Sequence, residues 1–452
     1  MTCTDSSTKK PGYDSDIILS GLTGLNDEDA IKRFHAIFNE EIEYLKYAYA
    51  TPEAGTGAGL VSEEPTPSRL LYGQDYVEVN RSLVGMLALK WVLANDYSAF
   101  TRYQPPAVKL TPESFAEFRA LCIDCLPTPE DTLTLLAAIV INDLGKSSRF
   151  VEDIEAVTGS QMGDSNHDVV VYTAAQKNMI PCLRNLGSSH REDILLGLQL
   201  SAGLNIAQLA QAENVPGSLK TAAIMNGHTR AFNLKFLETL FDVAGASANR
   251  EARCAKQMVE PVFQSYMMTR DIIMNVIEGR GSLRENYDQL LAKHGRNLET
   301  RGFRRLVVSV PSERALLRLL MMGRSTNNAE QAGLFEAAFE ALPPKDKQAL
   351  VNGLNVDGVD DGEAIIPYYM PALIAEGLRN TTDSATLKIK ALSSLMRFLG
   401  RVYGNPKDVR GTHGSVVEHN LMYVMEVVHG QAFKVDPEVL DKVQVDTNEG
   451  LP

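Results

Sequence analysis

The 452-residue sequence contains little cysteine and a single tryptophan. Its five cysteines are an odd number and are spread along the chain from Cys3 to Cys254, unlike the dense disulfide frameworks of small secreted domains. Residues 1–13 are polar and lack the apolar stretch of a signal peptide. These absences argue against a secreted protein, and we expect a reducing, cytoplasmic location.

Long apolar runs and a surplus of basic charge are also missing. The apolar run Leu133–Ile141 is far shorter than the roughly 20 residues that a membrane-spanning helix requires, so we expect no membrane partner. The formal net charge of -13 argues against a cationic coat for unspecific nucleic-acid binding, although it allows a local basic patch. The sequence has no dinucleotide-binding glycine fingerprint, Walker-type phosphate loop or nucleophile elbow. We therefore predict no cofactor.

What the sequence does contain is helical periodicity. In residues 29–49, apolar side chains recur at three- and four-residue steps, which gathers them on one helical face. The same period is found in residues 77–93, 115–126, 131–141, 195–210, 232–244, 259–277, 334–342 and 387–402. The best strand candidate, Leu306–Val310, is too short for a sheet-based core. The sequence therefore predicts an all-α fold, a large multi-helix globular domain.

The domain organisation is read from length and composition. The length suits one large helical domain or two closely fused ones, and we predict a single all-α catalytic domain over residues 15–435. Residues 1–14 and the acidic residues 436–452 are expected to be loose tails. Residues 51–68 contain several glycines, alanines and prolines, and we predict a mobile surface loop that can close over a site.

A first polar cluster follows the apolar stretch that ends at Ile141. Asp143 comes directly after Asn142, and further His and Asp residues follow on later helical stretches: His167, Asp168, His228 and Asp242. The pattern resembles the HD-type metal phosphohydrolases, an all-helical family in which a His-Asp pair and further His and Asp residues bind divalent cations. That resemblance implies a distant HD-like helical core.

Asn142 stands where the HD-type family has its first histidine. An amide is a much poorer ligand for a transition metal than an imidazole, so we predict no metal site. Instead we assign a role in substrate binding to the remaining members of the cluster, Asp143, His167, Asp168 and His228. The structural alternative is that the two aspartates cap helices while the two histidines are hydrogen-bonded inside the protein.

A second cluster places four carboxylates, Asp357, Asp360, Asp361 and Glu363, within seven residues. They repel one another unless a cation lies among them. One interpretation is an exposed turn in which Asp360 or Asp361 is the N-cap of the next helix. The other is a site that binds a guanidinium group through paired, charge-assisted hydrogen bonds, or that holds Mg²⁺.

A third feature is a local reversal of charge between Arg280 and Arg324. Ten cations, nine of them arginine, face only four carboxylates in this segment, a surplus of six in a chain that is negative overall. Arginine suits phosphate recognition because its planar fork pairs with two oxygens. The segment therefore indicates a polyanionic partner, and structural salt bridges are the alternative.

The stretches 141–146, 166–172, 226–246 and 355–372 resemble a fungal family that includes the arginine-containing cyclodipeptide synthases. The acidic DDxxE motif of that family has its nearest match in residues 360–363, Asp-Asp-Gly-Glu, which is one residue shorter. The resemblance would run over most of the chain. It implies an aminoacyltransferase that condenses arginyl-tRNA with a second aminoacyl-tRNA to a cyclic dipeptide, without ATP, in the biosynthesis of alkaloid-like secondary metabolites. The two charged tRNAs are the implied partners, and no obligatory protein partner is inferred.

Aminoacyl esters are already activated, so such an enzyme chiefly positions its substrates, deprotonates the attacking amine and stabilises oxyanions. Within this hypothesis the catalytic residues are Asp360, Asp361 and Glu363, and Asp357 also binds substrate. The tRNA-binding residues are Arg296, Arg301, Arg304 and Arg305. The alternatives are an HD-like metal-dependent hydrolase and a non-catalytic helical binding protein.

Overall fold

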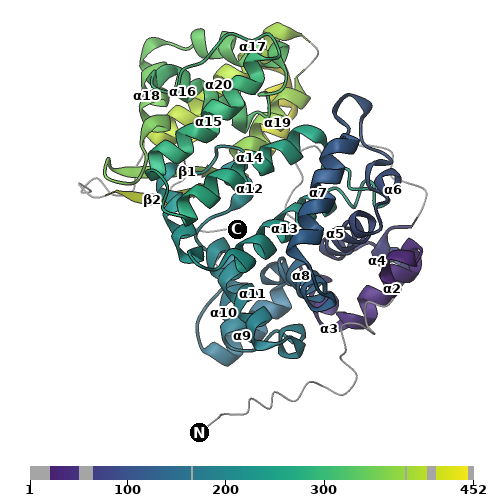
Figure 1. Ribbon diagram of the computed structural model, residues 1–452. Helices are drawn as coiled ribbons and strands as arrows, with labels where there is room; N and C mark the ends of the chain where they lie inside the picture. The colour runs from purple at the N-terminus through teal and green to yellow at the C-terminus, as the bar shows by residue number, and fades with distance from the viewer. Residues whose placement is uncertain (1–20, 50–64, 164–165, 382–383, 405–413, 446–452) are drawn as a thin grey trace. The chain divides into compact units, whose positions relative to one another are not determined.

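The computed structural model describes residues 21–49, 65–163, 166–381, 384–404 and 414–445 (Figure 1). As predicted, the fold is built almost wholly from helices. In the described ranges the strands form one two-stranded sheet, and none of the helices there is long and apolar enough to cross a membrane. The predicted tail over residues 1–14 and most of the predicted loop over residues 51–68 lie outside the described residues.

The chain divides into two compact units where a single domain was expected. The first unit comprises the described parts of residues 1–51, 58–202 and 225–264, and the second comprises those of residues 203–224 and 265–452. One long helix, α14 (Glu260–Ile277), contains the last boundary.

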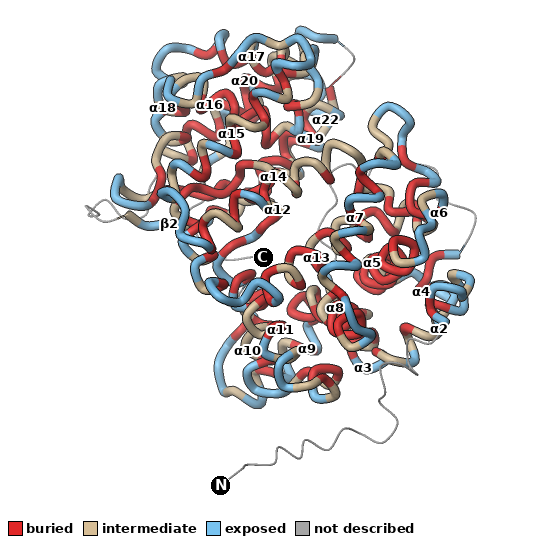
Figure 2. The backbone as a smooth tube through the Cα atoms, in the orientation of Figure 1, coloured by how far each residue is buried: buried red, intermediate tan, exposed pale blue. Residues whose placement is uncertain are grey.

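The first unit contains most of the helices of the N-terminal half, with 3₁₀-helices labelled η. They are η1 (Leu22–Gly24), α2 (Asp27–Ile37), α3 (Asn39–Leu45), α4 (Pro67–Tyr72), α5 (Val77–Leu93), α6 (Tyr97–Thr101), η2 (Pro106–Val108), α7 (Pro112–Cys125), α8 (Pro129–Ile141), η3 (Leu144–Lys146), α9 (Ser148–Thr158), α10 (His167–Gln176), η4 (Cys182–Asn185), α11 (Ser188–Ser201) and α13 (Thr229–Gly245). Helix α5 is buried along most of its length (Figure 2). It therefore forms the centre of this unit's core.

Two glycines allow α5 and α13 to cross in close contact. A Cβ added to Gly245 would lie 2.2 Å from the backbone oxygen of Arg81, and one added to Gly85 would lie 2.9 Å from the backbone oxygen of Phe241. Backbone atoms inside two helices cannot give way as the end of a flexible side chain can. The crossing therefore requires residues without a Cβ at both positions.

We expect the substitution Gly245→Ala to lower the free energy of unfolding by about 3 kcal/mol, because overpacking a rigid helix contact forces the backbone apart. Gly333→Ala is the matched control, since the added Cβ there has no atom within 4 Å and alanine in a helix stabilises by up to about 1 kcal/mol. Urea unfolding of both variants measures the difference. Equal free energies of unfolding for the two variants would contradict the close contact between α5 and α13.

The second unit contains the remaining elements. They are α12 (Ile206–Ala210), η5 (Pro216–Met225, whose last residue belongs to the first unit), α15 (Leu283–Glu299), α16 (Pro311–Met322), α17 (Ala329–Glu340), α18 (Pro344–Asn355), β1 (Glu363–Tyr368), α19 (Met370–Asn380), α20 (Ala385–Tyr403), β2 (Ser415–Asn420), η6 (Met422–Val424), α21 (Met425–His429), α22 (Gln431–Val435) and η7 (Pro437–Lys442).

The sheet of the second unit was not predicted. β1 pairs with β2 in parallel, with Glu363 opposite Ser415, and Ala364 and Ile366 pack against Val215 in a small apolar cluster. The apolar run after the acidic cluster is thus a strand, so the interpretation in which Asp360 or Asp361 is the N-cap of a following helix is wrong. The predicted strand at 306–310 is irregular chain.

Several predicted boundaries also differ from the structure. Residues 195–210 were expected as one helix, but α11 and α12 are separated by a turn at residues 202–205. Residues 437–442, assigned to the loose acidic tail, form η7 with Leu440 buried. Arg401 of α20 donates hydrogen bonds to the backbone oxygens of Leu440, Asp441 and Val443. The ordered chain therefore extends beyond the expected boundary at residue 435.

A buried carboxyl group caps α19 in the second unit. Glu213 is 3% exposed and accepts a hydrogen bond from the backbone N–H of Tyr369 at 2.7 Å. Tyr369 has a φ of 83°, which is unusual for a residue with a side chain. Burial, and then the nearby Glu418, raise the pKa of Glu213 from 4.5 to about 8.

This shift makes stability depend on pH. Between pH 4.5 and about 8 the folded protein keeps the proton of Glu213 while the unfolded chain releases it, so its contribution to stability is complete below 4.5 and is lost as the pH rises through 8. Glu213→Gln removes this dependence. We expect the variant to gain on the order of 2 kcal/mol over the wild type between pH 5 and pH 9 in urea unfolding. Parallel stability profiles would contradict this assignment.

Candidate functional site

Four segments of the first unit converge on one cluster of ionisable side chains. They are the N-terminal part of α5, the end of α8 with η3, the start of α10, and α13. η3 lies directly against α10, since a Cβ added to Gly145 would be 2.2 Å from the backbone oxygen of His167. On its other side η3 is held by backbone pairing, in which the Tyr49 N–H donates to the oxygen of Lys146 at 3.1 Å. We call the resulting cluster the charge network.

The centre of the charge network consists of two carboxyl groups and two cations. Asp143 Oδ1 lies 2.7 Å from Lys146 Nζ, and Glu78 Oε2 lies 3.6 Å from the same nitrogen. Arg81 Nη1 lies 3.2 Å from Glu78 Oε2 and 3.9 Å from Asp143 Oδ2. The Glu78 side chain has no exposed surface and that of Asp143 is 5% exposed. Both carboxyl groups therefore share the same two cations inside the protein.

Burial and mutual proximity move the two pKa values apart. Burial and the adjacent Asp143 carboxylate raise the pKa of Glu78 from 4.5 to about 8. Burial alone would also raise the pKa of Asp143, but Lys146 and Arg81 hold it well below its ordinary value. Two like charges so close cannot both ionise readily, and one proton is shared. The raised pKa keeps Glu78 protonated at neutral pH, so Glu78 is the donor and Asp143 the acceptor of the hydrogen bond between the two side chains.

The charge network reaches solvent at its edge. Asp242 of α13 lies 3.4 Å from Arg81 Nη2 and its side chain is 31% exposed. His167 Nε2 lies 3.9 Å from Asp143 Oδ1 and 3.9 Å from Asp168 Oδ1, and its side chain is 25% exposed. His167 and Asp242 therefore form the solvent-exposed edge of the charge network.

A second pair of charges adjoins the network on α13. Lys235 and Glu238, one helical turn apart, form a buried ion pair, and Lys235 Nζ also donates to Asn142 Oδ1 at 3.4 Å. Burial raises the pKa of Glu238 to about 7, with Asp242 and Asp168 adding to the rise and Lys235 opposing it. The two residues line a small recess of about 270 Å³, counting space open to solvent, between α8, α11 and α13.

The structure brings together four of the five His and Asp residues of the first predicted cluster, since Asp242 also lies in the charge network. Asp143, His167 and Asp168 are all in the charge network. His228 is not, since it is exposed at the N-cap of α13. The structural alternative also fails in part, because the cap of α10 is Asn166, whose side chain accepts from the Asp168 N–H at 2.9 Å.

The positions expected for metal ligands are occupied by other contacts. Asn142 is a hydrogen-bond acceptor for Lys235, and the charge of Asp143 is compensated by Lys146 and Arg81. Within the described part of the chain, no group of three or more His, Cys, Asp or Glu side chains is arranged to hold a metal ion. The geometry thus gives no support to the HD-like reading.

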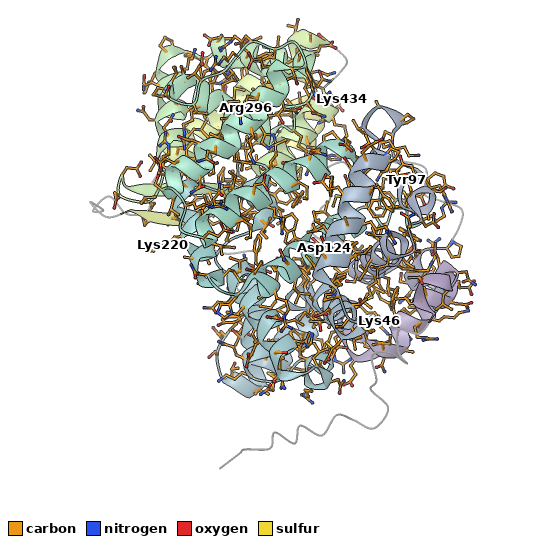
Figure 3. All side chains as sticks on the ribbon, viewed as in Figure 1. Lys46, Tyr97, Asp124, Lys220, Arg296 and Lys434 are labelled. Carbon is orange, nitrogen blue, oxygen red and sulfur yellow. The ribbon has the colours of Figure 1, made fainter. Side chains whose placement is uncertain are left out.

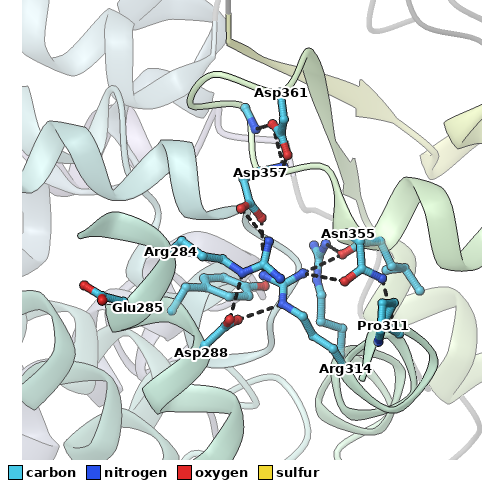
Figure 4. Close-up of polar contacts among 12 residues, drawn as sticks. Arg284, Glu285, Asp288, Pro311, Arg314, Asn355, Asp357 and Asp361 are labelled. Atoms are coloured by element: carbon cyan, nitrogen blue, oxygen red, sulfur yellow. Dashed lines mark hydrogen bonds and ion pairs between the residues drawn. The ribbon is translucent and has the colours of Figure 1, made fainter. Parts of the chain in front are cut away.

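The acidic cluster of the second unit is held by arginines of the same chain. Asp357 contacts Arg284 Nη1 at 2.5 Å and Arg314 Nη2 at 3.3 Å, and Asp288 contacts both arginines at 2.7 Å (Figure 4). Asp361 accepts hydrogen bonds from the backbone N–H groups of residues 357 and 358. The cation that the sequence required among these carboxylates is therefore internal, and part of the arginine surplus serves it.

Asp360 is exposed, and Glu363 is the partly buried first residue of β1. The structure does not place Asp360, Asp361 or Glu363 in a pocket with the predicted tRNA-binding arginines. Their catalytic role stays a prediction, whereas the contacts of Asp357 and Asp361 favour a structural role in this turn.

The predicted tRNA-binding arginines are all exposed, at the end of α15 and in the loop that follows. Arg304 is bound by Glu313 at 2.8 Å and Glu336 at 2.5 Å. Arg296 (Figure 3), Arg301 and Arg305 have no ion-pair partner among the described residues. Those three side chains are therefore available to a polyanion.

Another arginine of the same segment has a purely internal function. Arg318 is fully buried and donates to the backbone oxygens of Leu354, Ala212 and Asn214 at 2.7 to 3.4 Å. These hydrogen bonds connect α16 to α18 and to the residues that follow α12. The structural alternative for the arginine surplus is thus correct for part of the segment.

Four residues of the site were not predicted from the sequence: Glu78, Arg81, Lys235 and Glu238. One signal was present, because Glu78 and Arg81 interrupt the otherwise mostly apolar stretch 77–93, and charged side chains are almost never fully buried unless paired. Lys235 and Glu238 stand three residues apart, the spacing of neighbours on a helix. Neither signal shows which residues these charged side chains contact in the folded protein.

Comparison with known proteins was made over the whole chain. The model of a family of unknown function (DUF6829) matches residues 31–440. No curated protein matches the chain, and no solved structure matches it. The matched range includes the charge network, the recess, the Asp357 cluster and the exposed arginines.

Proposed function

We propose that this chain, which belongs to the family of unknown function DUF6829, is an aminoacyltransferase whose active site is the charge network. In this proposal it condenses arginyl-tRNA with a second aminoacyl-tRNA into an arginine-containing cyclic dipeptide. The observation that carries the proposal is the Glu78–Asp143 pair, two buried carboxyl groups that contact the same two cations, Lys146 and Arg81. Strongly shifted ionisable groups at an accessible edge are typical of catalytic sites.

The chemistry of the proposed reaction needs such a pair. An aminoacyl ester reacts when its partner's α-amino group, which must first lose a proton, attacks the ester carbonyl carbon. A C–N bond forms, the C–O bond to the tRNA ribose breaks, and the proton passes to the leaving oxygen. The pKa of Glu78 is raised by burial to about 8, close to that of an α-amino group at about 8, so proton exchange between the two is nearly balanced. A second aminolysis closes the ring.

The charge of the network suits a cationic substrate. Together with the adjoining Lys235–Glu238 pair, it contains five carboxyl groups: Glu78, Asp143, Asp168, Glu238 and Asp242. They face only three permanent cations, Arg81, Lys146 and Lys235. Negative charge buried in excess is costly unless protons or a bound cation compensate it. An arginyl side chain and an α-ammonium group both provide that compensation.

The exposed arginines of the second unit support the tRNA part of the proposal. Arg296, Arg301 and Arg305 lie on a chain that is otherwise acidic and have no ion-pair partner among the described residues. Binding of phosphates by such side chains releases counterions and needs no sequence reading. The reaction requires no cofactor, and we propose that it takes place in the cytoplasm.

Incubation of the purified protein with charged tRNAs tests the proposal. We expect a diketopiperazine that contains arginine, detected by mass spectrometry, only when arginyl-tRNA is present. If none of the amino acids offered as partner on tRNA yields such a product, the proposed function is wrong.

A further inference from the structure

The recess between α8, α11 and α13 combines apolar walls with charged side chains. Ile141, Leu198 and Leu234 contribute apolar surface, and Asn142, Asp193, Lys235 and Glu238 contribute the polar groups. Its volume of about 270 Å³ includes open solvent, so the enclosed space is much smaller. The recess therefore takes only a small group, and only when the Lys235 side chain that lines it moves aside.

The polar side of the recess carries two carboxyl groups, each paired with one cation. Glu238 is 2% exposed and its close cation is Lys235, from the preceding turn of α13. Asp193 is paired with Arg230 at 2.5 Å, and the Arg230 side chain is 48% exposed. An incoming anion would meet two carboxyl groups, whereas an incoming cation can replace the ammonium group of Lys235 as the partner of Glu238.

We infer that this recess is a binding site for a guanidinium or alkylammonium group on an aliphatic stem. Glu238 is its carboxylate partner, the apolar walls contact the stem, and Lys235 moves aside toward solvent. A guanidinium group bonds a carboxylate through two parallel hydrogen bonds, which one ammonium group cannot match. The site itself does not depend on the proposed function, but the identity of its natural ligand, an arginyl side chain, rests on that function.

Binding of n-butylguanidinium to the whole chain, measured by calorimetry without tRNA, tests the inference. We expect saturable binding to the wild type and at least about 10-fold weaker binding to Glu238→Gln, because the charge-assisted pair is lost. Glu376→Gln is the matched control. Glu376 is also 2% exposed and is also paired with a cation one helical turn away, in its case Arg379, but lies in the second unit. It should bind the probe as the wild type does.

A second variant covers the case in which Glu238→Gln folds poorly. Lys235→Met leaves the Glu238 carboxylate buried without its cation, so the variant should melt at a lower temperature, and n-butylguanidinium should raise its melting temperature more than that of the wild type. No binding to the wild type, equal binding to Glu238→Gln, or preferential binding of butyrate would each overturn the inference. Probe binding without cyclic dipeptide formation would refute only the proposed function. Formation of the cyclic dipeptide without binding of n-butylguanidinium would refute only the inference that the recess is a binding site.

Discussion

Replacing Glu78 by glutamine is expected to slow cyclic dipeptide formation by about 100-fold or more, the usual contribution of a general acid–base group. Glutamine has nearly the size of the protonated carboxyl group and can still donate a hydrogen bond to Asp143, but it cannot release a proton. Because burial raises the pKa of Glu78 to about 8, the wild-type side chain is already neutral near pH 7. We therefore expect the melting temperature to change by less than about 2 °C.

Asp143→Asn is the contrasting variant. It removes the charge that lies 2.7 Å from Lys146 Nζ, so Lys146 and Arg81 lose their ionised partner and the free energy of unfolding should fall by about 3 kcal/mol. Product formation and urea unfolding, measured on both variants, separate the two effects. An active Glu78→Gln enzyme would show that the shared proton only serves stability.

Replacing Arg296, Arg301 and Arg305 together by alanine is expected to weaken tRNA binding on the order of 100-fold at fixed salt, with about 5-fold from each lost phosphate contact. The dependence of log affinity on log salt concentration should become shallower by about 2 to 3, roughly 0.9 for each contact. Stability should be unchanged, because the three side chains are exposed and have no ion-pair partner among the described residues.

A control variant removes the same charge from elsewhere in the second unit. Lys220, Arg280 and Lys345 are exposed cations outside the loop after α15, and Lys220 and Arg296 are both marked in Figure 3. Alanine at these three positions should leave the affinity for tRNA within about 3-fold of the wild type. Equal losses in both triple variants would mean that only net charge matters and that the loop is not the tRNA site.

Much of the secondary structure could be read from local patterns. The apolar period in residues 77–93 predicts α5 with the bounds that it has, Val77–Leu93, because one apolar face is enough to define an amphipathic or buried helix. The split between α11 and α12 and the strand β1 were not predictable in this way. A short apolar run such as residues 364–368 suits a strand or a helix equally, and its pairing with β2, some fifty residues later, decides between them.

The candidate site could be predicted from local sequence only in part. Local sequence singled out Asp143, His167 and Asp168 because His and Asp residues at such spacings resemble the ligands of a metal site. Glu78 and Glu238 were missed because their chemistry depends on neighbours that are distant in the chain.

The sequence by itself determined that the chain is helical and acidic overall, and that the crowded carboxylates after residue 356 require a cation. Periodicity and net charge are properties of neighbouring residues, so they need no knowledge of the fold. Only the tertiary structure decided which cations those are, Arg284 and Arg314, and that Glu78 lies beside Asp143. Burial and distance set a carboxyl group's proton affinity, and both arise only when remote helices pack.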